Sequence, residues 1–152
     1  MNLFGPSGVA SLAGNLYALV VVDDYSRFTW TLFLAHKNHA YNAFKKLAKV
    51  LHNENGCCIK SIRSDHGGEF HNARFERFCE KHGISHSFSA PKTPQQNGVV
   101  ERKNISLEEL ARTMLNECKL PKYFWADVVY TAAYVLNKTL IRLILKKTPY
   151  EL

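Results

Sequence analysis

The sequence predicts a single mixed α/β domain. Short apolar, β-branched runs alternate along the chain with amphipathic helical segments, and turn-forming residues separate them. The length of 152 residues suits one domain, and an apolar fraction of 46% is enough to fill one core. The longest apolar run, 16–22, is too short to cross a bilayer, and no signal peptide is recognisable. No membrane contact and an intracellular location are therefore expected.

The first strong elements are two strands. Residues 16–22 are continuously apolar and β-branched, and residues 28–34 again favour an extended conformation. Between them, residues 23–27 read Asp-Asp-Tyr-Ser-Arg and supply turn chemistry. These features predict a β-hairpin with one buried strand.

Helices and strands then alternate. Apolar residues recur at helical intervals over 38–51, and Asn-Gly at 55–56 ends this segment. The same reasoning predicts, in chain order, a strand at 57–64, a helix at 72–81, a strand at 84–89, and helices at 99–116 and 122–137.

The last predicted helix is strongly apolar. Its apolar members are Phe124, Trp125, Val128, Val129, Ala132, Ala133, Tyr134 and Leu136. Packing in the core explains this helix better than base stacking does, and a subunit interface is the alternative.

Charge points to a polyanionic partner, whereas no zinc site is expected. The chain carries 20 Lys and Arg against 13 Asp and Glu, a net charge of +7. The four cysteines lack the paired spacing of a zinc module and are interpreted as reduced thiols. His82 and His86 have a ligand-like interval, but without a cysteine pair they are interpreted as ordinary loop and strand residues.

Two carboxylates stand in distinctive local sequences. Asp65 lies in a Ser-Asp-His-Gly-Gly-Glu-Phe segment, 64–70, directly after a predicted strand. Glu101 lies in the segment 94–104, Pro-Gln-Gln-Asn-Gly-Val-Val-Glu-Arg-Lys-Asn, which opens a helix. Carboxylates at a strand end and a helix start can converge on metal ions. Singly, Asp65 also fits a turn, and Glu101 fits an acid that complements the helix dipole.

Together these motifs resemble the catalytic core of retroviral-type integrases, specifically those of copia-like retrotransposons, over essentially all 152 residues. The resemblance implies a ribonuclease H-like fold, which is α/β with a mixed five-stranded sheet flanked by helices. It implies DNA integration by polynucleotidyl transfer with Mg²⁺ or Mn²⁺, which two aspartates and a glutamate hold. Asp65 and Glu101 match two of these ligands. The resemblance also implies that the partners are DNA ends and target DNA, that the protein forms a homo-oligomer, and that it is located in the nucleus.

The first aspartate of the family pattern is replaced. The pattern reads Asp-Leu-Xaa-Gly-Pro, whereas residues 2–6 read Asn-Leu-Phe-Gly-Pro, so Asn2 occupies the aspartate position. An amide brings no charge, so we expect weak metal binding and impaired catalysis. Substitution by Asp23 or Asp24 is the less favoured alternative, because both acids are expected to shape the hairpin turn.

The resemblance also bears on domain organisation. We interpret residues 1–152 as a core domain with a truncated first strand and without the family's zinc-binding and C-terminal domains. Because that strand is central in the fold, its neighbours at 16–22 and 59–63 are expected to lack a complete shared partner, which predicts marginal stability.

In the family, the helix that carries the glutamate lies along DNA. This implies that residues on and before it contact nucleic acid, namely Lys92, Asn97, Gly98, Arg102, Lys103 and Arg112. Asn97 and Gly98 are expected to form a flexible loop before the helix. The alternative is a solvated helix face on which Glu108 and Glu109 pair with Arg112.

Two other functions remain open. One is a catalytically inactive nucleic-acid-binding or dimerisation module, and the other is a nuclease of the same fold that cuts RNA–DNA hybrids. The sequence of 94–104 argues against the second.

Overall fold

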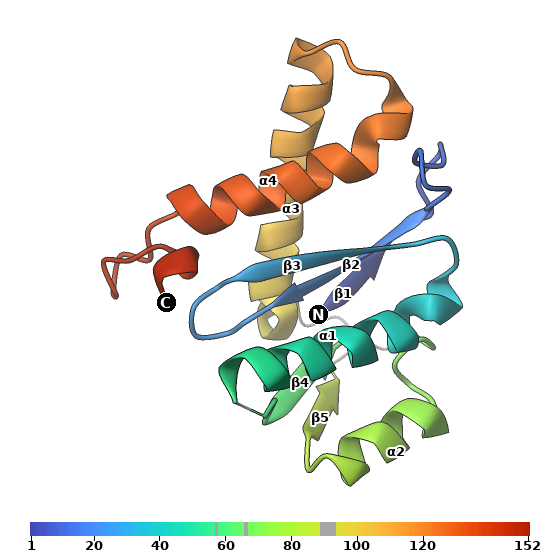
Figure 1. The fold of residues 1–152 in the computed structure, drawn as a ribbon, viewed down its shortest axis with the longest axis vertical. Helices are drawn as coiled ribbons and strands as arrows, with labels where there is room; N and C mark the ends of the chain where they lie inside the picture. The colour runs from blue at the N-terminus through green and yellow to red at the C-terminus, as the bar shows by residue number, and fades with distance from the viewer. Residues whose placement is uncertain (57, 66, 89–93) are drawn as a thin grey trace.

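A computed structural model describes residues 1–56, 58–65, 67–88 and 94–152, which form a mixed α/β fold (Figure 1). The strands are β1 (Asn2–Phe4), β2 (Tyr17–Val22), β3 (Thr29–Leu34), β4 (Ser61–Ser64) and β5 (Ser85–Phe88). The α-helices are α1 (Ala40–Asn55), α2 (Ala73–Lys81), α3 (Pro94–Glu117) and α4 (Trp125–Thr139). Short 3₁₀ helices are η1 (Lys37–His39), η2 (Lys122–Phe124) and η3 (Pro149–Glu151).

The strands form two hydrogen-bonded groups. β1, β2 and β3 make an antiparallel meander, whereas β4 and β5 pair in parallel. The predicted order of a meander followed by parallel strands is confirmed. All five predicted strands are present, but among the described residues they form two ladders instead of one. The reason is the shortness of β1, which pairs with β2 over three residues and meets β4 through a bond from the Met1 amino group to Arg63 O at 2.6 Å.

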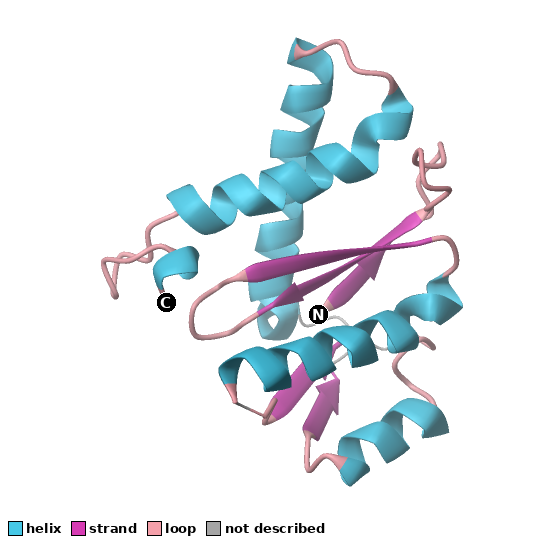
Figure 2. Cartoon of the chain, in the orientation of Figure 1, coloured by secondary structure: helices cyan, strands magenta, loops and turns pink. Residues whose placement is uncertain are grey.

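Helices cover both faces of the meander (Figure 2). Side chains alternate across β2, so Leu19 joins a cluster with Phe44 of α1 while Val20 packs with Leu107 of α3 and Ala132 of α4. Leu19 and Val20 are both fully buried. This two-sided burial explains why β2 is continuously apolar, as the sequence analysis predicted.

An aromatic cluster fixes the loop that follows β4. Phe70 and Phe75 are fully buried, with ring centroids 5.3 Å apart, and Phe44 of α1 lies 5.9 Å from Phe75. Phe70 comes from the loop after β4, and Phe75 comes from α2. Burial of these rings therefore anchors the chain segment that contains Asp65 against α1 and α2.

Residues at the ends of two helices explain where these helices end and begin, and the predicted end of the first helix near 55–56 is confirmed. Gly56 follows α1 in the left-handed conformation, with φ of 60°, which glycine adopts without a steric penalty. The side chain of Asn72 caps α2 by accepting hydrogen bonds from the backbone N–H groups of Arg74 and Phe75.

The start of α3 corrects the sequence analysis. The helix begins at Pro94 rather than at 99, so Asn97 and Gly98 are helical and do not form a loop before it. Proline is tolerated at a first helical position, where its missing N–H would have no intrahelical partner. Glu101 consequently lies about two turns into the helix, beyond the reach of the dipole effect that a first-turn acid would have.

The apolar face of α4 belongs to the core. Val128, Val129, Ala132 and Ala133 are buried against α3 and the meander, as predicted. Tyr134 differs, because 53% of its surface is exposed. Within the described ranges, no helix has the length and hydrophobicity needed to cross a membrane.

Candidate functional site

Asp65 lies directly after β4 and is half-buried. Its Oδ1 atom accepts a hydrogen bond from the Gly67 N–H at 3.2 Å. Burial lowers the pKa of the Met1 amino group to about 6, and the charge of Asp65 partly opposes this by raising it. The electrostatic influence shows that Asp65 lies near the start of β1.

Gly67 gives room to a second carboxylate in the same loop. A Cβ atom on residue 67 would overlap Glu69 Oε2 and would lie 3.1 Å from Asp65 Oδ1. Glu69 is mostly buried, and its Oε1 atom lies 3.9 Å from Lys37 Nζ. Glu69 is not among the site residues that the sequence predicts. The sequence could have indicated Glu69, because it stands in the same short motif as Asp65 and directly follows the glycine pair.

Asn2 lies on β1, half-buried and opposite Val20 of β2. Because the Met1 amino group donates to Arg63 O, the start of β1 adjoins β4 two residues before Asp65. Asn2 and Asp65 therefore lie on chain segments that are neighbours in space.

Glu101 lies on α3 and is half-buried. The two preceding residues, Val99 and Val100, line an open cavity of about 920 Å³ that Met1 and Arg63 also line. This shared cavity shows that the elements carrying Asn2, Asp65 and Glu101 border one region of the molecule.

The three predicted ligands, Asp65, Glu101 and Asn2, are of a chemical type that suits Mg²⁺, because they offer two carboxylates and one amide oxygen. These three residues carry one negative charge fewer than the two aspartates and one glutamate that the family resemblance implies. Over the described ranges, no group of three or more His, Cys, Asp or Glu side chains is arranged to hold a metal ion.

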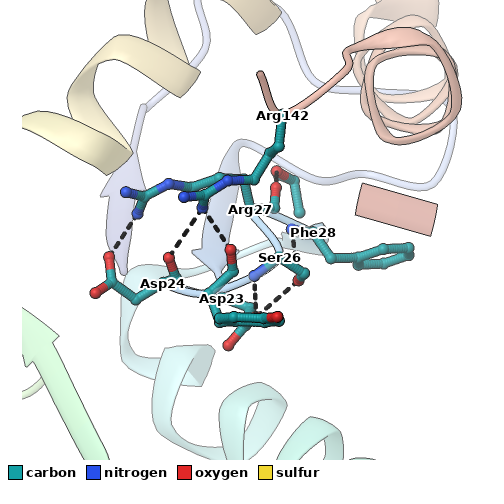
Figure 3. A network of polar contacts seen from close by, with 8 residues as sticks. Asp23, Asp24, Ser26, Arg27, Phe28 and Arg142 are labelled. Atoms are coloured by element: carbon teal, nitrogen blue, oxygen red, sulfur yellow. Dashed lines mark hydrogen bonds and ion pairs between the residues drawn. The ribbon is translucent and has the colours of Figure 1, made fainter. Parts of the chain in front are cut away.

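Asp23 and Asp24 are engaged in the hairpin turn (Figure 3). Asp23 Oδ2 accepts hydrogen bonds from the N–H and the hydroxyl of Ser26, both at 2.7 Å. Asp24 Oδ1 pairs with Arg27 at 2.5 Å, and Arg142 donates to Asp24 O at 3.3 Å. These contacts agree with the interpretation that both acids shape the turn.

Arg102 and Arg112 are exposed on α3. The Arg102 guanidinium lies over Gly98, with both terminal nitrogens 3.8 Å from the position that a Cβ on Gly98 would take. In the part of the chain that the structure describes, Arg112 makes no ion pair within 4.0 Å with Glu108 or Glu109. The pairing alternative is therefore not seen for Arg112.

Lys103 differs from these two arginines. It is 9% exposed, and burial, with a further effect from Arg27, lowers the pKa of its ammonium. The reason is its position beside the buried stripe of α3, which consists of Val100, Asn104, Leu107 and Ala111. Lys103 thus does not share the exposed side of Arg102 and Arg112. Lys92 and the side chain of Asn97 lie outside the described residues.

Known proteins resemble this chain in sequence. Residues 4–94 match the integrase core domain family. The chain is 42% identical over 138 residues to the retrovirus-related Pol polyprotein from transposon TNT 1-94 of Nicotiana tabacum, covering 91% of this chain and 10% of the polyprotein. The chain thus spans about a tenth of the length of the curated relatives it matches.

Solved structures resemble it in fold. The catalytic core domain of HTLV-2 integrase, in complex with magnesium and in a trimeric form, has a TM-score of 0.66 and 20% identity, covering 99% of this chain and 93% of that chain. A chain of the simian T-cell lymphotropic virus intasome in complex with PP2A regulatory subunit B56 gamma has a TM-score of 0.73 and 20% identity, covering 99% and 53%.

At these identities the structural likeness shows the fold alone, and it confirms the predicted ribonuclease H-like architecture. The sequence matches confirm the resemblance to copia-type retrotransposon integrase cores. The chain belongs to the integrase core domain family.

Proposed function

We propose that this chain is an integrase catalytic core that acts on DNA ends by metal-dependent polynucleotidyl transfer, and that Asn2 impairs its metal site. The observation that carries the proposal is the bond from the Met1 amino group to Arg63 O, which sets the start of β1 beside the segment leading to Asp65. The uncharged side chain of Asn2 therefore belongs to a strand that begins beside the segment leading to Asp65.

Asp65 and Glu101, with the amide oxygen of Asn2, are the residues that would hold Mg²⁺ or Mn²⁺. When bound, such ions activate the attacking oxygen and stabilise the leaving oxygen. The magnesium complex of the HTLV-2 core supports this choice of ion. The Gly67 N–H restrains one oxygen of Asp65. If the uncharged Asn2 removes about 4 kcal/mol of transition-state stabilisation, the rate falls about a thousandfold.

DNA binding rests on exposed charge. Arg102 and Arg112 are exposed on α3, and the chain carries a net charge of +7. Such groups neutralise phosphates without reading sequence, so affinity falls as salt rises. Lys92, Asn97 and Gly98 remain candidates for the same surface, whereas the buried Lys103 is the weakest candidate. The intasome and the trimeric HTLV-2 core support a homo-oligomer that assembles on DNA.

Nicking and strand transfer on a labelled DNA end, with Mn²⁺, test the proposal. We compare the unmodified chain with Asn2→Asp, with Asp65→Asn in both the unmodified and the Asn2→Asp backgrounds, and with Asn116→Asp, which adds a charge at an exposed position. The proposal predicts activity with Asn2→Asp alone among these. Activity of the unmodified chain that Asp65→Asn abolishes would contradict the impairment. Silence of Asn2→Asp would contradict the assignment of residue 2 to the site.

A second candidate function is a nucleic-acid-binding module without catalysis. The exposed Arg102 and Arg112 favour it, because their contacts with phosphate require no metal. It is preferred if DNA affinity falls steeply with salt while every variant stays at background activity.

A further inference from the structure

One buried polar atom of α3 has no hydrogen-bond partner. Asn104 is 8% exposed, and among the residues that the structure describes its Oδ1 atom accepts no hydrogen bond. A buried acceptor without a donor is unfavourable, so its presence in a folded chain calls for an explanation. A cation that binds this oxygen would provide one.

Asn104 shares a helix face with Glu101. It follows Glu101 by three positions on α3, and side chains at this spacing lie on one face with Cβ atoms about 5–6 Å apart. Metal ligands in helical proteins use the same spacing, because one helix then offers two ligands to one ion. A carboxylate and a carboxamide oxygen of α3 can therefore reach a single ion.

The side chain of Asn2 faces α3. Side chains alternate across β1, so Leu3 packs against the cluster on the α1 side, whereas Phe4 packs against the cluster that contains Leu107 of α3. Asn2 points to the same side as Phe4, because side chains two positions apart in a strand share a face. Its partner in β2, Val20, belongs to the same cluster as Leu107, which agrees with this direction.

The two asparagines also match in position along β1 and α3. At one end, Met1 and Val100 line the same cavity. At the other end, Phe4 packs against the cluster that contains Leu107. Between these two contacts the strand and the helix each rise by about 10 Å. Both asparagines lie within this span, so their carboxamides lie at the same level between β1 and α3.

We propose that Asn104 is a further oxygen ligand of the divalent ion whose predicted ligands are Asp65, Glu101 and Asn2. The ion gives the Asn104 Oδ1 atom the partner that it lacks, and carboxamide oxygens are of a type that Mg²⁺ and Mn²⁺ accept. Asn104 is uncharged, so it does not replace the negative charge that is missing at Asn2. This inference rests on the proposed function, because it concerns the same metal site.

Calorimetric titration with Mn²⁺ and thermal unfolding in EDTA test the inference in the Asn2→Asp background. Asn104→Leu is expected to weaken Mn²⁺ binding at least about tenfold, because an oxygen ligand is lost. In EDTA the same change is expected to raise the Tm, because it removes a buried acceptor without a donor. Damage to the fold would lower the Tm, so the opposite signs separate a lost ligand from a structural defect.

A second variant retains the shape of the side chain. Asn104→Asp is expected to tighten Mn²⁺ binding at least about tenfold, because a carboxylate replaces a neutral ligand, and to lower the Tm in EDTA through the buried charge. Asn116→Asp is the matched control, because it adds the same charge at an exposed position of the same helix. It is expected to leave the Mn²⁺ affinity unchanged.

Two results would overturn the inference and leave the proposed function intact. One is an unchanged Mn²⁺ affinity in both Asn104 variants while Asn2→Asp still binds more tightly than the unmodified chain. The other is an equal gain from Asn104→Asp and Asn116→Asp. If Asn2→Asp binds no more tightly than the unmodified chain, the proposed function fails instead, whereas a loss of affinity in Asn104→Leu still supports Asn104 as a ligand.

Discussion

The side chain of Asn137 forms two hydrogen bonds with the backbone of Thr29. Its Oδ1 atom accepts from the Thr29 N–H and its Nδ2 donates to Thr29 O, both at 2.9 Å. Both residues are buried, and 108 positions separate them in the sequence. The pair joins α4 to the first residue of β3, where the strand leaves the hairpin turn.

Replacing Asn137 with Ala is expected to lower the free energy of unfolding by about 2–3 kcal/mol, because two buried backbone groups lose their partners. Asn104→Ala is the matched control. Asn104 is also buried, but across the described residues its Oδ1 atom has no hydrogen-bond partner, so its loss is expected to cost less. Urea unfolding measures both, and equal costs would contradict the role given to the Asn137 pair.

Stability is expected to fall as the pH drops below about 6.5. Burial lowers the pKa of His86, and the charges of His71 and the Met1 amino group lower it further, against an opposing effect of Glu76. The unfolded chain then binds more protons than the folded chain in this range, so the neutral imidazole stabilises the fold only at higher pH.

Urea unfolding near pH 5 and near pH 7.5 checks this dependence. His86→Gln is expected to reduce the difference between the two pH values, whereas the same change at the exposed His39 is not. His86 Nε2 lies 2.9 Å from Ser64 Oγ, a contact that glutamine can retain. An unchanged pH dependence in His86→Gln would show that another group causes it.

DNA affinity is expected to depend on the exposed arginines of α3. Arg112→Ala should reduce the slope of log Kobs against log salt by about one, without changing the melting temperature. Lys103→Met should leave the slope unchanged and raise the urea midpoint, because it removes a buried ammonium. Fluorescence anisotropy on a DNA duplex at several salt concentrations separates the two. The reverse pattern would assign the phosphate contact to Lys103.

The unmodified chain is expected to melt at or below the ordinary mesophile range of about 45–65 °C. β1 pairs with β2 over three residues, and among the described residues the meander and the β4–β5 pair form separate hydrogen-bonded groups, so the two groups do not stabilise each other through one ladder. Differential scanning calorimetry measures this directly. A cooperative transition well above the range would contradict the account of the two strand groups.

Local patterns predicted much of the fold. The two-sided burial of β2 followed from its unbroken apolar run, and the end of α1 followed from Gly56. The start of α3 did not follow, because Pro, Gln, Asn and Gly over 94–98 have the composition of a loop. The favourable place of proline at a first helical position outweighed that composition. The division of the strands into two groups depends on pairing between distant segments, which periodicity does not report.

Only the part of the candidate site that lies in distinctive local motifs could be predicted from the sequence. Asp65 and Glu101 stand in distinctive motifs, whereas Glu69 is recognised only once Gly67 is seen to give its carboxylate room. Lys103 was grouped with Arg102 by its charge. The apolar spacing of Val100, Leu107 and Ala111 would have placed it beside the buried stripe instead.

Mn²⁺ binding to the unmodified chain and to Asn2→Asp tests the central claim most directly, by calorimetric titration together with thermal unfolding, and with Asn116→Asp as the control. The added carboxylate is expected to tighten binding at least about tenfold. In EDTA, the same change is expected to lower the Tm through repulsion with Asp65. Equal Mn²⁺ affinities for the two chains would contradict the claim that the uncharged Asn2 weakens the metal site.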